Sequence, residues 1–279
     1  MPRASIRGVT LHYEIAGERG PWVALAPGGR RGIEGVATLS QRLAQAGCRV
    51  LMHDRRNCGA SDVSIEGEGS EYEIWADDLH ALLAQLGATR AFIGGSSSGC
   101  RMALIYALRY PQAVDGLLIW RVTGGGVAAK RLARNYYGQY IELARAGGMA
   151  AVCASEHFAA RIAERPANRA LLMAMDPQHF IAAMERWNRY FVEGADLPVI
   201  GATEAQLRSI AAPACVVPGN DNSHPRPVGE NLARLLPRAE LQSIGLPDYD
   251  RDLSPRDEWA EREPALAGFF TDFMARVRA

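Results

Sequence analysis

The sequence predicts one α/β fold, in which helices cover a mostly parallel sheet and a helical segment is inserted after the sixth strand. Three observations support this prediction. Short apolar runs of strand length alternate with helical patterns up to Trp120. From residue 122 to about 206 the pattern is helical, without a convincing strand. The alternation resumes at residue 214, so both ends of the chain are expected to build one sheet.

The first part of the chain reads as an antiparallel edge followed by parallel strands. Residues 4–6 and 10–15 alternate as the two strands of a hairpin do. Continuous apolar runs predict buried strands, because a strand covered on both faces needs no polar side; these runs are at 22–26, 49–53, 91–94 and 114–120. Helices are expected between them, at 35–46, 70–86 and 98–110. Ser70 and Glu73 have the spacing of a capping box, which favours a helix start there.

The last part returns to the strand and helix alternation. Apolar runs predict strands at 214–217 and 240–244, with a helix near 228–236 between them. A final amphipathic helix carries Trp259, Leu266 and Phe273. We therefore expect an α/β core made of residues 1–121 and 207–279, and a helical cap made of residues 122–206.

Composition excludes several classes of partner. The chain has 31 basic and 31 acidic side chains, so it lacks the positive charge that nucleic acid or an anionic membrane surface requires. Its five scattered cysteines form no C-x-x-C pair, which is typical of a reduced cytoplasmic protein without a zinc site. We expect no membrane span, metal or other cofactor, and a small-molecule substrate. Homodimerisation through the cap stays open.

The strongest local signal is the segment from Ile93 to Gly99, Ile-Gly-Gly-Ser-Ser-Ser-Gly. A strand that runs into G-x-S-x-G and then into a helix is a nucleophile elbow, here with Ser97 at its centre. Glycines at 95 and 99 let strand and helix pack closely around a strained turn, which exposes the serine hydroxyl. The alternative is a Gly/Ser-rich turn without a chemical role, and the flanking strand and helix favour the elbow.

Together with two further motifs, the elbow resembles the α/β-hydrolase family over nearly the whole chain. Asp-Arg-Arg-Asn-Cys-Gly-Ala-Ser at 54–61 resembles the family's D-x-R-G-x-G-x-S turn, with Asn57 in place of a glycine. Leu-Ala-Pro-Gly-Gly at 25–29 resembles its H-G-x oxyanion loop, with Pro27 in place of histidine. The resemblance implies that the Gly29 and Ser98 N–H groups stabilise an oxyanion and that the cap roofs the substrate pocket.

The resemblance also implies an acid after the seventh strand, and Asp221 is the best match. Its spacing to Pro225 fits the family, although it lies one residue too close to Gly219. A turn-forming role for this aspartate is the alternative. The family's histidine follows the last strand, but this chain has no histidine after His224. A serine hydroxyl needs an adjacent base, so the usual triad is incomplete at that position.

Several residues are candidates for the missing base. His224 follows Asp221 closely and is expected at the same edge of the sheet; a structural role at a helix start is equally consistent with its position. His157 and His179 lie in the cap, where histidines on helices are more often structural. A further group of candidates is the carboxylates Asp248, Asp250 and Asp252, for which an exposed acidic loop is the simpler explanation.

The sequence supports three hypotheses on function. The first is a serine hydrolase that acts on an ester, a lactone or a carbon–carbon bond of a small carbonyl compound, with Ser97, Asp221 and a displaced base such as His224. The second is a non-hydrolytic lyase or isomerase, and the third is an inactive homologue that binds a small molecule. Trp120 and Arg121 are expected beneath the aromatic-rich cap, where Arg121 would steer a carboxylate; mutual packing is the alternative.

Overall fold

The computed structural model describes residues 2–279, with the side chain of Arg256 excepted, and confirms the predicted fold class. Eight strands form one sheet in the order β1-β2-β4-β3-β5-β6-β7-β8. β2 pairs antiparallel with both of its neighbours, β1 and β4. The strands β3 to β8 are parallel to one another. The strands are β1 (Arg3–Ile6), β2 (Val9–Ala16), β3 (Trp22–Ala26), β4 (Arg49–His53), β5 (Ala91–Ser96), β6 (Val114–Trp120), β7 (Ala214–Val217) and β8 (Ala239–Leu241).

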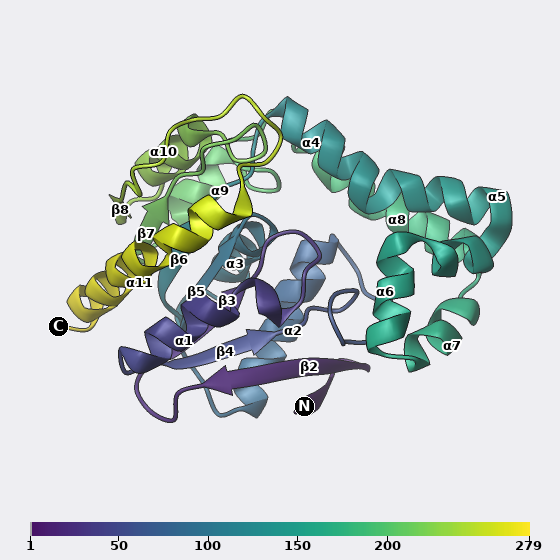
Figure 1. Cartoon of the computed structure of the whole chain (residues 1–279), viewed down its shortest axis with the longest axis horizontal. Coiled ribbons are helices and arrows are strands. Elements are labelled where there is room, and N and C mark those ends of the chain that lie inside the picture. Colours follow the sequence, from purple (N-terminus) through teal and green to yellow (C-terminus); the bar gives the residue numbers. More distant parts are fainter. Residues whose placement is uncertain (1) are drawn as a thin grey trace.

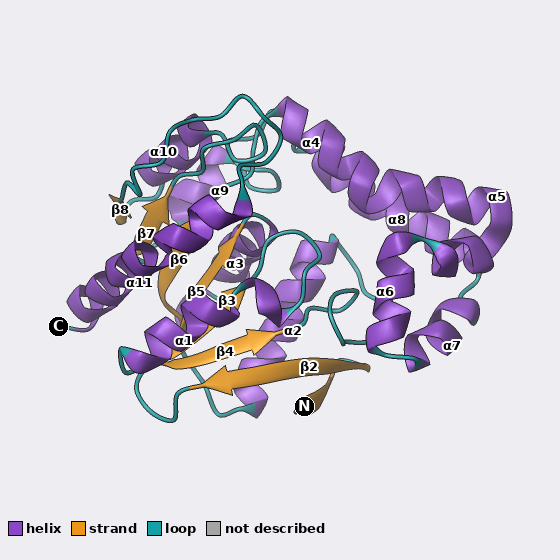
Figure 2. Cartoon of the chain, viewed as in Figure 1, coloured by secondary structure: helices purple, strands orange, loops and turns teal. Residues whose placement is uncertain are grey.

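Helices cover both faces of this sheet (Figures 1 and 2). One face buries apolar side chains of α1 (Ala37–Gln45) and α11 (Arg256–Arg278), and the other those of α2 (Glu71–Gln85), α3 (Ser98–Arg109) and α10 (Arg226–Leu235). Two apolar cores therefore sandwich the parallel strands, and the carboxyl ends of these strands meet at one edge of the sheet.

A group of helices follows β6 and lies to one side of the sheet (Figure 1). It consists of α4 (Gly126–Ala133), a π-helical turn (Arg134–Gly138), α5 (Gln139–Ala154), α6 (Glu156–Glu164), α7 (Ala167–Met173) and α8 (Pro177–Glu193). The predicted helical insertion after the sixth strand, called the cap below, is thus present, and its role as a roof over a substrate pocket stays a prediction. Its boundaries at residues 121/122 and 206/207 stay a prediction; α9 (Glu204–Ser209) spans the second of them.

The observed elements differ little from the predicted ones. The capping box of Ser70 and Glu73 is present at the start of α2, as predicted. β5 continues to Ser96, two residues beyond its predicted end, because Gly95 and Ser96 still pair with β6. The prediction of a strand at 240–244 was too long. β8 spans Ala239–Leu241, and one more backbone hydrogen bond to β7, from the Gln242 N–H to the Val216 carbonyl, follows it.

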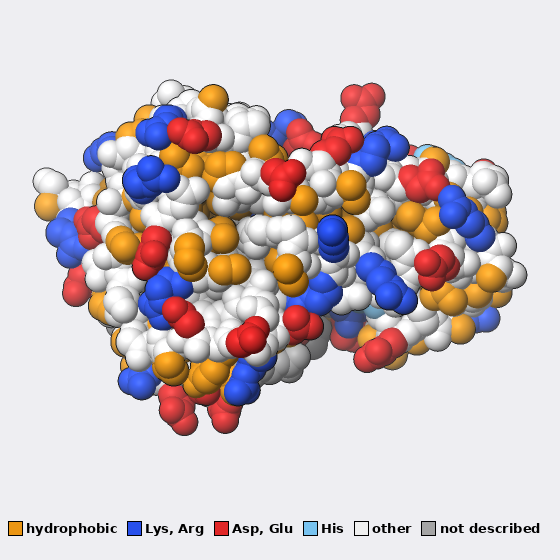
Figure 3. All heavy atoms as spheres, turned by 90° about the horizontal axis from the view of Figure 1, so that it is seen from above, with side chains coloured by type: hydrophobic (Ala, Val, Ile, Leu, Met, Phe, Trp, Pro, Cys, Tyr) orange, Lys and Arg blue, Asp and Glu red, His pale blue; other side chains and the backbone are white. Residues whose placement is uncertain are grey.

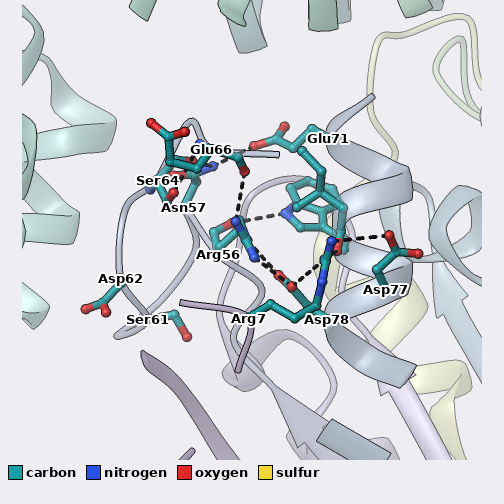
Figure 4. Close-up of polar contacts among 12 residues, drawn as sticks. Arg7, Arg56, Asn57, Ser61, Asp62, Ser64, Glu66, Glu71, Asp77 and Asp78 are labelled. Atoms are coloured by element: carbon teal, nitrogen blue, oxygen red, sulfur yellow. Dashed lines mark hydrogen bonds and ion pairs between the residues drawn. The ribbon is translucent and has the colours of Figure 1, made fainter. Parts of the chain in front are cut away.

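The loop after β4 is held against α2 (Figure 4). Arg56 donates two hydrogen bonds to the carboxylate of Asp78, at 2.6 and 2.7 Å, and its carbonyl accepts one from Trp75. Asn57 has a φ of 67°, as expected for the residue that replaces a glycine, and its amide donates to Glu71 at 3.0 Å. These contacts bring the side chain of Glu71 beneath the cap.

The molecular surface carries both signs of charge. On the face seen in Figure 3, acidic and basic side chains are interspersed over the core and the cap, without a continuous basic surface on that face. No helix within residues 2–279 has the length and apolar character that crossing a membrane requires.

Candidate active site

Ser97 occupies a strained turn between β5 and α3. Its φ of 55° and ψ of −108° lie outside the regions that residues with a side chain usually adopt. The neighbouring glycines allow this turn: a Cβ at Gly99 would lie 2.1 Å from the carbonyl oxygen of Ala26, and one at Gly95 would lie 2.4 Å from the carbonyl carbon of Gly99. These glycines therefore allow the strained turn that places Ser97 at the carboxyl end of β5.

The loop after β3 lies directly against this turn. A Cβ at Gly28 would lie 3.1 Å from the Cβ of Ser97, and Gly29 has a φ of 60°, which favours glycine. Arg55 donates to the Gly29 carbonyl at 2.9 Å and so fixes the orientation of that peptide group. Ser98 is the first residue of α3, so its N–H has no acceptor within the helix. Oxyanion binding by the Gly29 and Ser98 N–H groups stays a prediction.

Asp221 and His224 form a hydrogen-bonded pair in the turn that follows β7. Asp221 Oδ1 lies 2.7 Å from His224 Nδ1 and also accepts the backbone N–H of His224, at 2.9 Å. The turn is tight, and the backbones of the two residues form an isolated β-bridge. A Cβ at Gly219 would lie 2.3 Å from the Cβ of His224, so a glycine is required where the imidazole is seated. Both side chains are buried.

The electrostatics of this pair favour a neutral imidazole beside a carboxylate. Burial lowers the pKa of His224 to about 4; Asp221 acts in the opposite direction, while the charges of Arg121 and Arg101 lower the pKa further. Burial by itself would raise the pKa of the Asp221 carboxyl. Hydrogen bonds and charge interactions with His224, the backbone N–H of Ser254 and Arg121 outweigh burial and hold that pKa well below its usual range. Near pH 7 the imidazole is therefore free to accept a proton.

Ser97 and His224 line the same cavity, which has a volume of about 540 Å³. The loop residues Gly28 and Gly29 border it on one side, and Ser223, Ser254 and Pro255 border it on another. The cap contributes Arg131, Leu132, Asn135 and Tyr136. Because Nδ1 of His224 is bound to Asp221, Nε2 is the ring nitrogen left for this cavity. The structure thus brings four of the predicted site residues, Ser97, His224, Asp221 and Gly29, together at one edge of the sheet.

Comparisons with known proteins agree with this fold. Residues 21–120 match the family model described as the alpha/beta hydrolase fold. An enol-lactonase from Burkholderia xenovorans LB400 superimposes with a TM-score of 0.64 at 22% identity, covering 98% of this chain and 100% of that one. The chain therefore has the α/β-hydrolase fold, and residues 21–120 match its family model.

The curated proteins that match part of the chain include hydrolases. The uncharacterized hydrolase YraK of Bacillus subtilis is 32% identical over 113 residues, which are 40% of this chain and 41% of the relative. A 2-hydroxy-6-oxononadienedioate/2-hydroxy-6-oxononatrienedioate hydrolase of Paraburkholderia xenovorans is 35% identical over 121 residues, 42% of this chain and 40% of the relative. The chain thus covers about two fifths of the length of the curated relatives that it matches.

Sequence reasoning missed Thr123, which contacts Ser97, and Ser254, which binds Asp221. The Oγ1 of Thr123 lies 3.0 Å from Ser97 Oγ and is completely buried. Within residues 2–279 there is no direct hydrogen bond between Ser97 and His224, so Thr123 is the partner of the serine hydroxyl in this structure. The available signal was position alone, since Thr123 follows the carboxyl end of β6, next to β5 in the sheet.

The other candidate bases lie elsewhere. His157 contacts the carbonyl of Asn57 at 3.0 Å and lines a different cavity, and His179 is exposed on α8. Asp248 and Asp252 are exposed and form ion pairs with Arg226 and Arg131, respectively. A further carboxylate, Asp250, accepts a hydrogen bond from the side chain of Asn222. None of these five side chains borders the cavity of Ser97.

The expectation for Trp120 was wrong. Its side chain packs against Phe270 of α11, with ring centroids 5.6 Å apart, and so lies on the sheet face away from the cap. Arg121 does border the cavity, but its guanidinium forms an ion pair with Asp221 at 2.9 Å. The carboxylate of Asp221 therefore neutralises the charge of Arg121. The prediction that Arg121 steers a substrate carboxylate loses support for that reason.

Proposed function

We propose that this protein is a serine hydrolase that cleaves an ester, a lactone or a carbon–carbon bond of a small carbonyl compound. One observation carries the proposal: Ser97 and the neutral, Asp221-bound imidazole of His224 line one cavity beside the Gly28–Gly29 loop. The similar proteins include a 2-hydroxy-6-oxononadienedioate/2-hydroxy-6-oxononatrienedioate hydrolase and an enol-lactonase, which supports this range of reactions.

The mechanism follows from these positions. Ser97 Oγ attacks the substrate carbonyl carbon while Nε2 of His224 takes the hydroxyl proton. Asp221, bound at Nδ1, orients the imidazole and stabilises its protonated form. The Gly29 and Ser98 N–H groups stabilise the oxyanion. His224 then returns its proton to the leaving group, and water, activated by the same imidazole, hydrolyses the acyl-serine.

Two steps adapt the family mechanism to this chain. The base comes from the turn after β7, three residues beyond the acid, instead of from the loop after β8. The serine hydroxyl, which bonds to Thr123 in this structure, turns about its χ1 bond toward the cavity when substrate binds. The cost of giving up one hydrogen bond of this kind is about 1 kcal/mol, which is small beside the barrier of acyl transfer.

The lining of the cavity combines arginine side chains with apolar surface. Arg31 and Arg131 border the cavity, together with apolar surface from Leu132, Tyr136 and Leu253. No carboxylate side chain borders it among the residues that the structure describes. Arg131 is paired with Asp252, so the proposal rests on the apolar surface, against which the apolar part of a small carbonyl substrate packs.

A fluorophosphonate probe tests the proposal, because it reacts with an activated serine. We expect the unsubstituted protein to be labelled and Ser97→Ala to be unlabelled. His224→Gln should label at least about 100-fold more slowly, since general-base assistance contributes that much. His179→Gln is the matched control, because this histidine is exposed outside the cavity, and it should label normally. Absence of labelling in the unsubstituted protein, or normal labelling of His224→Gln, would contradict the proposal.

A second candidate, a non-hydrolytic lyase or isomerase, is favoured by the contact of Ser97 with Thr123. In that case the serine hydroxyl acts as a fixed hydrogen-bond donor to an enolate and never becomes acylated. Substrate turnover without any acyl-enzyme, together with an unlabelled Ser97, would favour this candidate over hydrolysis.

A further inference from the structure

The carboxylate of Asp221 accepts hydrogen bonds on both oxygens, and each oxygen has a different set of donors. Oδ1 accepts from His224 Nδ1, from the His224 N–H and from the Ser223 N–H, at 2.7, 2.9 and 3.1 Å. Oδ2 accepts from Arg121 Nη2 at 2.9 Å and from Ser254, whose N–H and hydroxyl lie at 2.8 and 2.9 Å. We propose that Arg121 and Ser254 are positioning residues that clamp Oδ2, so that Oδ1 stays directed at His224.

Arg121 reaches this position through an unusual backbone conformation. It follows the last residue of β6 with a φ of 54°, and its N–H donates to the carbonyl of Val217 in β7. Its guanidinium lies over the ring of Trp259, 5.1 Å from the ring centroid, and is largely buried. A buried guanidinium requires a countercharge, and Asp221 supplies it. The strained backbone and the aromatic contact both direct Arg121 to the acid.

Ser254 belongs to the loop in which the resemblance to the family places the catalytic histidine. This loop is tied to the turn after β7: the Tyr249 N–H donates to the carbonyl of Asn220, and the Asn222 N–H donates to the carbonyl of Arg251. Ser254 itself is buried. The loop after β8 thus supplies two donors to the acid, and the base comes from the turn that holds the acid. This inference rests on the function proposed above, since it assigns a task within that triad.

The clamp has an electrostatic consequence that a purely structural contact would lack. The charged groups that act most on His224 are Asp221 in its own turn, Arg121 after β6 and Arg101 in α3, and Arg31 and Arg131 border the same cavity. Arg121 favours the neutral imidazole, and its bond to Oδ2 reduces the attraction of the carboxylate for a proton on the ring. Removal of either clamp donor therefore leaves the imidazole more basic.

The ionisation of His224 measures this effect without reference to turnover. Imidazole ¹⁵N signals are followed by NMR over pH in the unsubstituted protein, in Arg121→Gln and in Ser254→Ala, with His224→Gln used for assignment. Loss of the nearby cation in Arg121→Gln should raise the pKa of His224 by about one pH unit. Ser254→Ala, a smaller change that keeps the fold testable, should raise it by less. The matched control Arg226→Gln removes a partly exposed guanidinium paired with Asp248 and should leave the His224 signal unchanged.

The acid limb of fluorophosphonate labelling should move to higher pH in the two clamp variants by the same amounts. A His224 pKa in both clamp variants equal to that in Arg226→Gln would overturn the inference. Failure of the proposed function shows differently, as absence of Ser97-dependent labelling in the unsubstituted protein, whatever the His224 signal does.

Discussion

Glu71 connects the segments around the site, and its substitution tests how much these connections stabilise the fold. Its side chain is completely buried at the start of α2 and accepts from three directions. Arg30 Nη2 donates to Oε2 at 2.7 Å, the Tyr137 hydroxyl to the same oxygen at 2.9 Å, and Asn57 Nδ2 to Oε1 at 3.0 Å. These donors come from the loop after β3, the cap and the loop after β4. One carboxylate therefore joins the cap to the loop that follows Gly29.

We predict that Glu71→Ala strongly destabilises the fold, because it isolates the Arg30 cation. Arg30 is buried, and its Nε and Nη1 have no acceptor among the described residues, so Glu71 is its countercharge. Breaking a buried ion pair by removing one partner costs about 3–5 kcal/mol. With a urea slope of roughly 3 kcal/mol/M, the unfolding midpoint should fall by about 1–2 M.

Urea unfolding followed by far-UV circular dichroism measures this change. The matched control is Glu185→Ala, which breaks the exposed ion pair with Arg145 and should cost less than about 1 kcal/mol. The double variant Arg30→Met/Glu71→Leu removes both charges and should recover most of the lost stability. Equal urea midpoints for Glu71→Ala and Glu185→Ala would refute this prediction. A double variant with a midpoint no higher than that of Glu71→Ala would refute it as well.

Three further predictions concern the elbow and the base. Gly99→Ala forces the new Cβ against the Ala26 carbonyl and should cost about 1–3 kcal/mol and abolish fluorophosphonate labelling; unchanged urea unfolding would contradict this. Thr123→Val frees the Ser97 hydroxyl and should raise the labelling rate by up to about tenfold, whereas a lower rate would assign Thr123 to the machinery. Because burial lowers the pKa of His224 to about 4, labelling should stay constant from about pH 7 to 5 and decrease below, as the proton occupies the basic nitrogen. A rate already halved at about pH 6.5, the ordinary histidine value, would refute that pKa.

Local patterns predicted the elements of this fold well. The strands Trp22–Ala26, Arg49–His53, Val114–Trp120 and Ala214–Val217 have the bounds that their apolar runs predict. Each of these strands is covered on both faces of the sheet, so the apolar run in the sequence begins and ends where the strand does. The elbow was predictable from its motif: Gly95 is required by its close contact with Gly99 within the same seven residues, whereas Gly99 is required by the Ala26 carbonyl in the neighbouring strand β3.

Contacts between distant segments were harder to predict. Nothing near Arg121 in the sequence reveals that its guanidinium binds a carboxylate 100 residues later. Trp120 is a different case, because alternation along β6 contained the answer. Leu117 and Ile119 lie in the core with α2 and α3, so Leu118 and Trp120 must face α11 on the other side. The prediction placed the Trp120 side chain beneath the cap because the residue ends the strand. The alternation of side chains along β6 was not taken into account.

The relocation of the base in the proposed triad follows from the order of the strands. β7 and β8 are parallel neighbours, so the loops that follow them begin about one strand spacing apart, ~4.8 Å, at the same edge of the sheet. A base from either loop can reach the carboxyl end of β5, provided that the acid reaches that base. In the loop after β8 the imidazole would need an acid from another segment. In the tight turn after β7, Asp221 binds both the ring and the backbone of His224. The orientation of the imidazole is therefore fixed by a residue of the same turn. The free oxygen of Asp221 then needs new partners, and Arg121 and Ser254 occupy that position. On this reasoning, the clamp on Asp221 accompanies the move of the base: once the histidine is in the turn after β7, the loop after β8 supplies Ser254 to the acid instead of a base.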